Sequence, residues 1–156
     1  LLMNQGLEKV VELYRIDSSK TFLAHAELGL FYYRTGRYRD SVLHLLYAGM
    51  TVITRTIEYQ RTYRPFWEYG NLESLFLAAR DERDNAAYLE ATHTAALLYY
   101  LGAALFAAGD SDGQKELMIL VRDAFGGTPW RGRAISQLAE PYIEPVITAE
   151  DFFYFF

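Results

Sequence analysis

The stretch ELGLFYYRTGRYRDSV, from Glu27 to Val42, decides the fold that we predict for this chain. Apolar residues recur at helical spacing as far as Arg34. The sequence Thr-Gly-Arg then follows, and Gly36 within it suits the left-handed residue that ends many helices. Helical periodicity resumes at Tyr38. The stretch therefore predicts a helix that ends, a tight turn, and a second helix that runs back along the first.

The same helical signal continues along the rest of the chain. We expect helices at 7–16, 21–34, 38–54 with an extension toward 59, from near 65 or 71 to 80, 85–108 as one long helix, 114–125 and 130–138. The charged run RDERDN and glycine-containing segments separate them. The predicted class is all-α, with a helical domain at 1–140 and an irregular, proline-interrupted tail at 141–156.

Composition excludes several classes of protein. The 156 residues carry 20 acidic and 15 basic side chains, which argues against nucleic acid as the main partner because phosphate binding needs a positive surface. The chain has no cysteine, so it has no disulfide or thiolate site. No apolar run approaches the roughly 20 residues of a transmembrane segment. Because the chain begins without methionine or a secretory leader, we expect a fragment or a processed form.

An internal repeat is the main long-range pattern of the sequence. Gly29 and Gly36 stand seven residues apart, and Gly102 and Gly109 repeat this spacing 73 residues further on. The offset equals about two periods of roughly 34 residues plus a small insertion. We place that insertion at the sequence SDGQ, residues 111–114.

Residues 22–55 resemble a tetratricopeptide repeat, and 95–129 resemble a degenerate copy of it. The resemblance is carried by Leu28, Gly29, Tyr32, Gly36, Tyr38, Ser41, Leu45 and Ala48 in the first copy, and by Leu101, Gly102, Gly109 and Pro129 in the second. His25 replaces the tryptophan of the family, and Ile53 replaces its closing proline. The resemblance implies an α-solenoid of about three stacked antiparallel helix hairpins, because one hairpin alone cannot bury both of its apolar faces.

In this family the first helix of each hairpin lines a concave groove, so the resemblance implies a set of groove residues. They are Leu23, Ala26, Leu30, Tyr33 and Arg34 in the first hairpin, and Ala96, Tyr99, Ala103 and Phe106 in the last. The set is apolar and aromatic, without the Lys and Asn residues by which some relatives bind a terminal carboxylate. Such a groove suits a peptide, an amphipathic helix or an acyl chain. The alternative is that the same rings only pack in the core or against another copy.

Other candidate sites are explained more simply as structure. Glu90 and His93 have the spacing of half a carboxylate-bridged metal site, but no second pair follows, so we expect no metal and no cofactor. We expect His25 in the core, and Asp40 beside His44 on a helix surface. The basic and aromatic run at 55–67 fits arginines lying over tyrosines on an exposed helix better than base stacking. No nucleophile, base and orienting group come together, so we expect no enzyme.

The sequence thus predicts a soluble, non-enzymatic adaptor that binds a peptide, a helix or a partner subunit, with self-association included. The alternative is a periplasmic accessory protein that carries a hydrophobic small molecule in the same groove. We expect the final residues DFFYFF to dock on this domain, a symmetry mate or a partner, because exposed aromatic residues are adhesive. Their last three residues resemble aromatic C-termini recognised in the bacterial envelope, so we favour the periplasm or envelope over the cytoplasm.

Overall fold

The computed structural model describes residues 18–145, and all regular secondary structure within that range is helical. The helices are α2 (Ser18–Arg34), α3 (Tyr38–Tyr63), α4 (Leu72–Asp81), α5 (Arg83–Ala91), α6 (Thr94–Ala107), α7 (Ser111–Ala124) and α8 (Pro129–Ala139). The predicted all-α class is confirmed for this part of the chain. The helix expected at 7–16 and the aromatic end of the tail lie outside the described residues.

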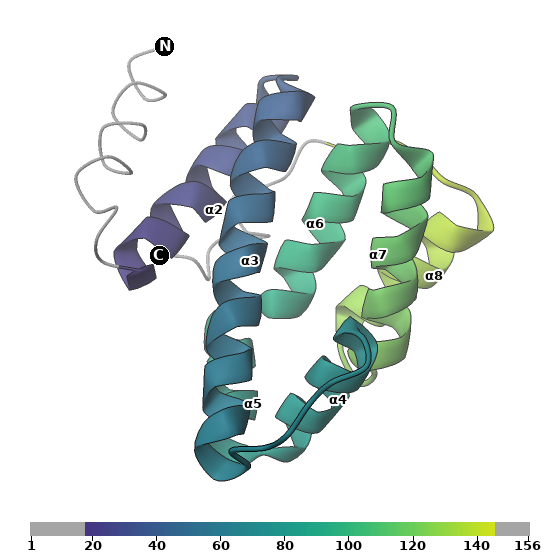
Figure 1. Cartoon of the computed structure of the whole chain (residues 1–156). Coiled ribbons are helices and arrows are strands. Elements are labelled where there is room, and N and C mark those ends of the chain that lie inside the picture. Colours follow the sequence, from purple (N-terminus) through teal and green to yellow (C-terminus); the bar gives the residue numbers. More distant parts are fainter. Residues whose placement is uncertain (1–17, 146–156) are drawn as a thin grey trace.

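The helices pack in a continuous series with α6 near its middle (Figure 1). α2 contacts α3, α3 contacts α6, α6 contacts α7, and α7 contacts α8. The short helices α4 and α5 form a pair beside the C-terminal half of α3. Residues 56–94, which spacing alone predicted as a hairpin, therefore supply the end of α3 and this short pair, while α3 packs directly against α6.

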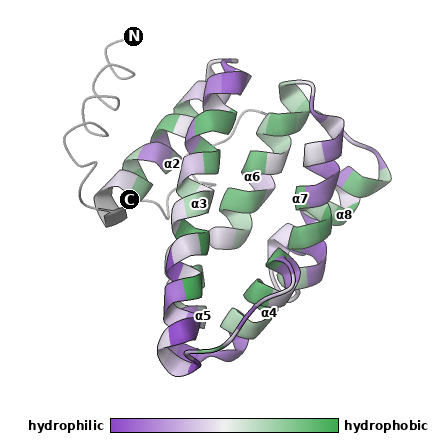
Figure 2. Cartoon of the chain, viewed as in Figure 1, coloured by the Kyte–Doolittle hydropathy of each residue, from purple (hydrophilic) through white to green (hydrophobic). Residues whose placement is uncertain are grey.

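Helix α6 is the centre of the core because it is apolar on all sides. Every residue from Thr94 to Ala104 is buried, and Figure 2 shows α6 in green and pale shades without a strongly hydrophilic side. A helix with no polar face is stable in water only when other helices surround it. None of the helices within residues 18–145 is both long and apolar enough to cross a membrane.

The turn that follows α2 is the one that the sequence predicts. Gly36 has φ +79°, and its amide donates to the carbonyl of Tyr33 at 3.2 Å. The amide of Arg37 donates to the carbonyl of Tyr32 at 2.9 Å. These two bonds form a Schellman motif, which satisfies carbonyls that the end of a helix leaves without partners.

The turn that follows α6 repeats this geometry 73 residues later. Gly109 has φ +100°, and the amides of Gly109 and Asp110 donate to the carbonyls of Phe106 and Leu105 at 3.0 and 2.8 Å. The next helix starts at Ser111, as α3 starts at Tyr38, so the predicted insertion at 111–114 is wrong. These residues are instead the first turn of α7, where the Asp110 carboxylate caps the helix.

Close approach of α2 and α3 depends on small side chains, as predicted. A Cβ atom added at Gly29 would lie 2.6 Å from Cγ of Leu45, which is fully buried. The hydroxyl of Ser41 donates to the carbonyl of Gly29 at 2.6 Å. At the matching contact of α6 with α7, a Cβ on Gly102 would lie 2.9 Å from Cε of Met118. The two glycines therefore have the same structural role.

The single helix predicted at 85–108 is wrong, because the chain forms α5 and α6 with a break between them. His93 lies at the break with φ +49°, a left-handed conformation that histidine adopts more readily than most residues. The hydroxyl of Thr92 donates to the carbonyl of Tyr88 at 2.8 Å and lies 2.8 Å from that of Thr94. Such local bonds compete with helix continuation. No glycine or proline marks this break in the sequence.

The ends of α3 and α4 follow from local signals. α3 runs to Tyr63, beyond the expected extension toward 59, and Arg64 leaves the helical conformation, with φ −136° and ψ 84°, because Pro65 follows it. α4 begins after Asn71, the second of the two predicted starts. The side chain of Asn71 accepts a hydrogen bond from the amide of Ser74 at 2.8 Å, and the Ser74 hydroxyl completes a capping box.

His25 is buried, as predicted, but the expected pair of Asp40 with His44 is wrong. Nδ1 of His25 lies 2.9 Å from Nδ1 of His44, so one ring donates to the other. Asp40 instead forms an ion pair with Arg37 at 2.8 Å, one helical turn away. The contact between His25 and His44 thus joins α2 to α3, which pack against each other.

We expect the fold to lose stability as the pH falls from about 7 toward 4. Burial, followed by the charge on His44, lowers the pKa of His25 from 6.5 to about 4. Between these values the unfolded chain binds more protons than the folded chain, so acid favours unfolding. The expected loss is about 1–3 kcal/mol, since each unit by which the pKa is lowered corresponds to about 1.4 kcal/mol. Urea unfolding at several pH values measures it. The variant His25→Phe should show a flatter pH dependence, and an unchanged dependence contradicts the assignment.

Candidate functional site

The residues predicted to line a groove divide into a buried and a surface set. Ala26, Leu30, Tyr33, Ala96, Tyr99 and Ala103 are each at most 6% exposed. Leu23 is 39% exposed, Arg34 is exposed and Phe106 is half-buried. Most of the set therefore packs inside the protein, and its role in binding stays a prediction.

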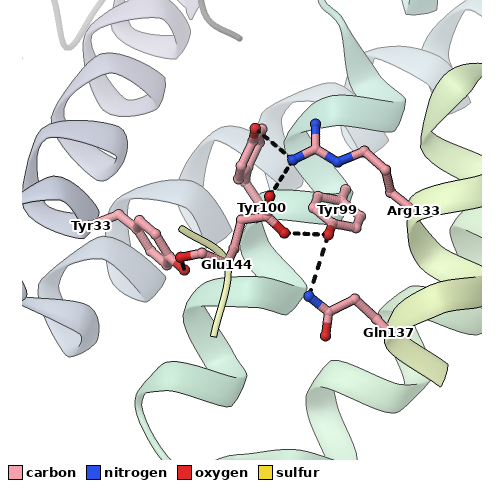
Figure 3. Close-up of polar contacts among 6 residues, drawn as sticks. All are labelled: Tyr33, Tyr99, Tyr100, Arg133, Gln137 and Glu144. Carbon is pink, nitrogen blue, oxygen red and sulfur yellow. Dashed lines mark hydrogen bonds and ion pairs between the residues drawn. The ribbon is translucent and has the colours of Figure 1, made fainter. Parts of the chain in front are cut away.

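Two of the buried residues, Tyr33 on α2 and Tyr99 on α6, meet at the segment that follows α8 (Figure 3). The hydroxyl of Tyr33 donates to the backbone carbonyl of Glu144 at 2.8 Å, and that of Tyr99 donates to its carboxylate at 2.5 Å. Residues 141–145 have no regular secondary structure, and within them Glu144 alone is buried, at 8% exposure. The segment thus joins α2 to α6 through one residue.

Helix α8 supplies the positive charge for this carboxylate. Arg133 forms an ion pair with Glu144, and its side chain is 31% exposed. Its guanidinium carbon also lies over three aromatic rings, at 4.9, 5.6 and 4.7 Å from the ring centroids of Tyr99, Tyr100 and Trp130. Cation–π contacts of this kind fix the guanidinium in place.

Gln137, also on α8, forms hydrogen bonds with the phenol of Tyr99 and with the backbone of the segment 141–145. Its Nε2 donates to the hydroxyl of Tyr99 at 3.3 Å, and its Oε1 accepts from the amide of Tyr142 at 3.1 Å. Gln137 is fully buried. We call the six residues drawn in Figure 3 the Glu144 site: Tyr33, Tyr99, Tyr100, Arg133, Gln137 and Glu144.

The electrostatics of the Glu144 site suit a carboxylate. Burial, followed by the hydrogen bond to Glu144, raises the pKa of Tyr99. Burial, followed by the charge of Glu144, raises the pKa of Tyr33. Both phenols therefore keep their protons at neutral pH and act as donors. A buried carboxylate is stable only when hydrogen bonds or an opposite charge replace its water, and the site provides both.

Sequence reasoning selected two of these six residues and missed the other four. Arg133 and Gln137 lie on a helix without a motif, Tyr100 was given no role, and Glu144 fell in the tail that we expected to be irregular. One signal was available. Glu144 stands in the stretch PYIEPV, where a single charge lies among apolar residues and prolines.

A cavity of about 440 Å³ lies between the α4–α5 pair, the start of α6 and the turn before α8. Its lining combines the polar and charged residues Arg80, Glu90, His93 and Thr94 with Phe125 and Trp130. Among the predicted groove residues, Ala96 reaches it. A polar ligand fits such a lining at least as well as an acyl chain does.

Glu90 and His93 do not share a helix, so the helical spacing inferred for them is wrong. α5 ends at Ala91, and the amide of His93 donates to the carbonyl of Glu90 at 3.1 Å in the turn. Within residues 18–145, no three histidine, aspartate or glutamate side chains are placed to hold a metal ion together.

The basic and aromatic run at 55–67 is an exposed helix end and loop, as predicted. Arg55 pairs with Glu58 at 3.4 Å and lies 5.8 Å from the ring of Tyr59. Phe66 is 97% exposed in the loop before α4. Arg55 and Tyr59 therefore contact each other on the helix surface.

Comparison with known proteins adds one distant relative. No family model matches the chain, and no solved structure matches it. A protein of Borreliella burgdorferi (strain ATCC 35210 / DSM 4680 / CIP 102532 / B31), described as "Uncharacterized protein", is 26% identical over 102 residues. The match covers 65% of this chain and 32% of that protein, so the chain matches about a third of the relative's length.

Proposed function

We propose that this chain is a non-enzymatic protein-interaction module related to tetratricopeptide repeats. Support comes from the two hairpins, α2–α3 and α6–α7, which share a turn geometry, a tight glycine contact and an offset of 73 residues. The first helix of each hairpin contributes a tyrosine that donates to Glu144, Tyr33 from α2 and Tyr99 from α6. Stacked helical repeats commonly bind partners along the surface formed by such equivalent helices.

One observation carries the proposal: the face formed by α2, α6 and α8 binds a peptide segment of the chain itself. Residues 141–145 are held there by side chains of three helices rather than by secondary structure. A buried anchor with surrounding weaker contacts is the usual way in which a peptide is recognised. We therefore propose a protein or peptide partner, a second copy included, for this face.

The carrier of a hydrophobic ligand has less support, because the cavity of about 440 Å³ has charged residues in its lining. The predicted periplasmic or envelope location has no bearing on this choice. The adaptor function and the location both stay proposals that experiment must test.

Peptides selected for binding to the full chain should lose about tenfold in affinity when Tyr33→Phe and Tyr99→Phe are combined. Phenylalanine keeps the buried rings but removes two hydroxyl donors, each worth about 0.5–1.5 kcal/mol. Alanine would be a poor test because Tyr99 is fully buried and its loss would leave a cavity. A displayed library of random peptides provides the ligands, and calorimetry provides the affinities.

The matched control is Met50→Ala, on the outer surface of α3, where the side chain is 59% exposed. This variant should bind the selected peptides as the unmodified chain does. Equal affinity of the double phenylalanine variant, or a library that yields no binder, contradicts the proposed binding face.

A further inference from the structure

We propose that the Glu144 site recognises a glutamate side chain within an extended peptide of a partner protein, and that Glu144 occupies this site in the free chain. The inference rests on the proposed function, because it names the partner chemistry of the same face. Glu144 thus acts as an internal copy of the ligand. The partner segment is one that presents a single carboxylate between apolar residues and prolines, as residues 141–145 do.

The arrangement of hydrogen-bonding groups fits a glutamate residue in an extended chain better than it fits a free anion. Tyr99 and Arg133 bind the carboxylate, while Tyr33 binds the backbone carbonyl of the same residue. Gln137 accepts from the backbone amide two residues earlier, at Tyr142. Side chain and backbone are therefore recognised together. A small anion could make the first pair of contacts but could not make the other two.

The segment that now occupies the site is bound through little else. Pro141, Tyr142, Ile143 and Pro145 are all exposed, with Tyr142 at 39% and Ile143 at 57%. A segment whose role was only to complete the core would bury its apolar side chains, since burial of apolar surface is the main stabilising term in packing. Here the apolar neighbours of Glu144 stay available for contact with a partner.

A competing peptide can also reach the site. The Arg133 side chain is 31% exposed, so a competing peptide can approach the site from this side. A buried ion pair contributes little net stability, because desolvation offsets much of the attraction between the charges. A partner glutamate would replace Glu144 on the same donors and leave no charge without a partner. Replacement of Glu144 by the partner glutamate therefore has a small net cost in free energy. The apolar contacts that the partner makes decide whether the replacement is favourable.

The test uses the full chain and two blocked peptides, acetylated and amidated so that they carry no terminal charge. One copies residues 141–145, PYIEP, and the other is PYIQP, which differs only in the carboxylate. We expect PYIEP to bind the variant Glu144→Ala about tenfold more tightly than the unmodified chain, whose site is occupied in cis. PYIQP should bind that variant at least about tenfold more weakly than PYIEP, since a charge-assisted hydrogen bond is lost.

Two further variants keep the result interpretable. Glu144→Gln retains the shape of the side chain and should open the site only partly, which covers the case that Glu144→Ala folds poorly by circular dichroism. Arg133→Gln combined with Glu144→Ala should bind PYIEP no better than PYIQP. Equal binding of both peptides to Glu144→Ala overturns the carboxylate inference but leaves the proposed binding face intact.

The remaining outcomes also separate the two proposals. If folded Glu144→Ala binds neither peptide while library peptides still depend on Tyr33 and Tyr99, the carboxylate inference fails alone. If no peptide of any kind binds, both fail. A dimer of the unmodified chain that dissociates in Glu144→Ala, measured by light scattering, would assign the occupant to a second copy and overturn the assignment to a partner protein.

Discussion

Replacement of Gly29 by alanine is expected to destabilise the protein by about 1–3 kcal/mol. The added methyl group would lie 2.6 and 2.8 Å from two side-chain carbons of Leu45 and 3.1 Å from its backbone nitrogen. Leu45 is fully buried, so its side chain has no free space to occupy. Because the backbone of α3 is close as well, rotation of the leucine alone cannot relieve the contact, and α2 must move away from α3. Urea denaturation measures the loss.

The matched control for this substitution is Gly49→Ala in the neighbouring helix. No atom of residues 18–145 lies within 4 Å of a Cβ added there, so alanine should raise stability by up to about 1 kcal/mol through its better helix propensity. Gly102→Ala should lie between the two, because its close neighbour is the flexible end of Met118. A Gly29→Ala protein as stable as the unmodified chain would show that the helices do not need this close approach.

Local rules account for the parts of the fold that the sequence predicted well. Gly36 and Gly109 end helices because a left-handed residue is needed there, and Gly29 and Ser41 are small because two helices cross over them. Each of these requirements involves residues close in sequence or repeated at a fixed offset. The break at His93 was missed because it depends on threonine side chains and on the packing of α6, which give no sequence punctuation.

The Glu144 site shows that sequence reasoning could not predict contacts between residues far apart in the chain. Tyr33 and Glu144 are 111 residues apart, and Tyr99 and Glu144 are 45 apart. No periodic pattern connects them, since residues 141–145 have no regular structure. The resemblance to helical repeats selected the two tyrosines because they occupy equivalent faces of equivalent helices. It could not select Glu144, which lies outside both stretches that carry the resemblance.

A second large effect is expected at Asn85, where substitution by aspartate should cost about 3 kcal/mol at neutral pH. Asn85 is fully buried, and its Nδ2 donates at 3.1 Å to both the carbonyl of Thr56 and Oε1 of Gln60. These bonds hold α5 against α3. Aspartate has almost the same shape, but it would place a charged oxygen against two acceptors. Gln60 can turn its amide to donate, whereas the Thr56 carbonyl cannot change.

The pH dependence of this variant distinguishes electrostatic repulsion from a packing defect. Burial and the facing carbonyl would raise the pKa of the new carboxyl group in the folded state above its unfolded value of about 3.9. The penalty should therefore be largest at neutral pH and shrink as the pH falls, because the protonated group can donate to Thr56. Asn71→Asp is the matched control: Asn71 caps α4 at the surface, and aspartate caps equally well, so its effect should stay within about 0.5 kcal/mol. A penalty at Asn85 that is small, or constant between about pH 7 and pH 5, would mean that the amide is not what joins α5 to α3.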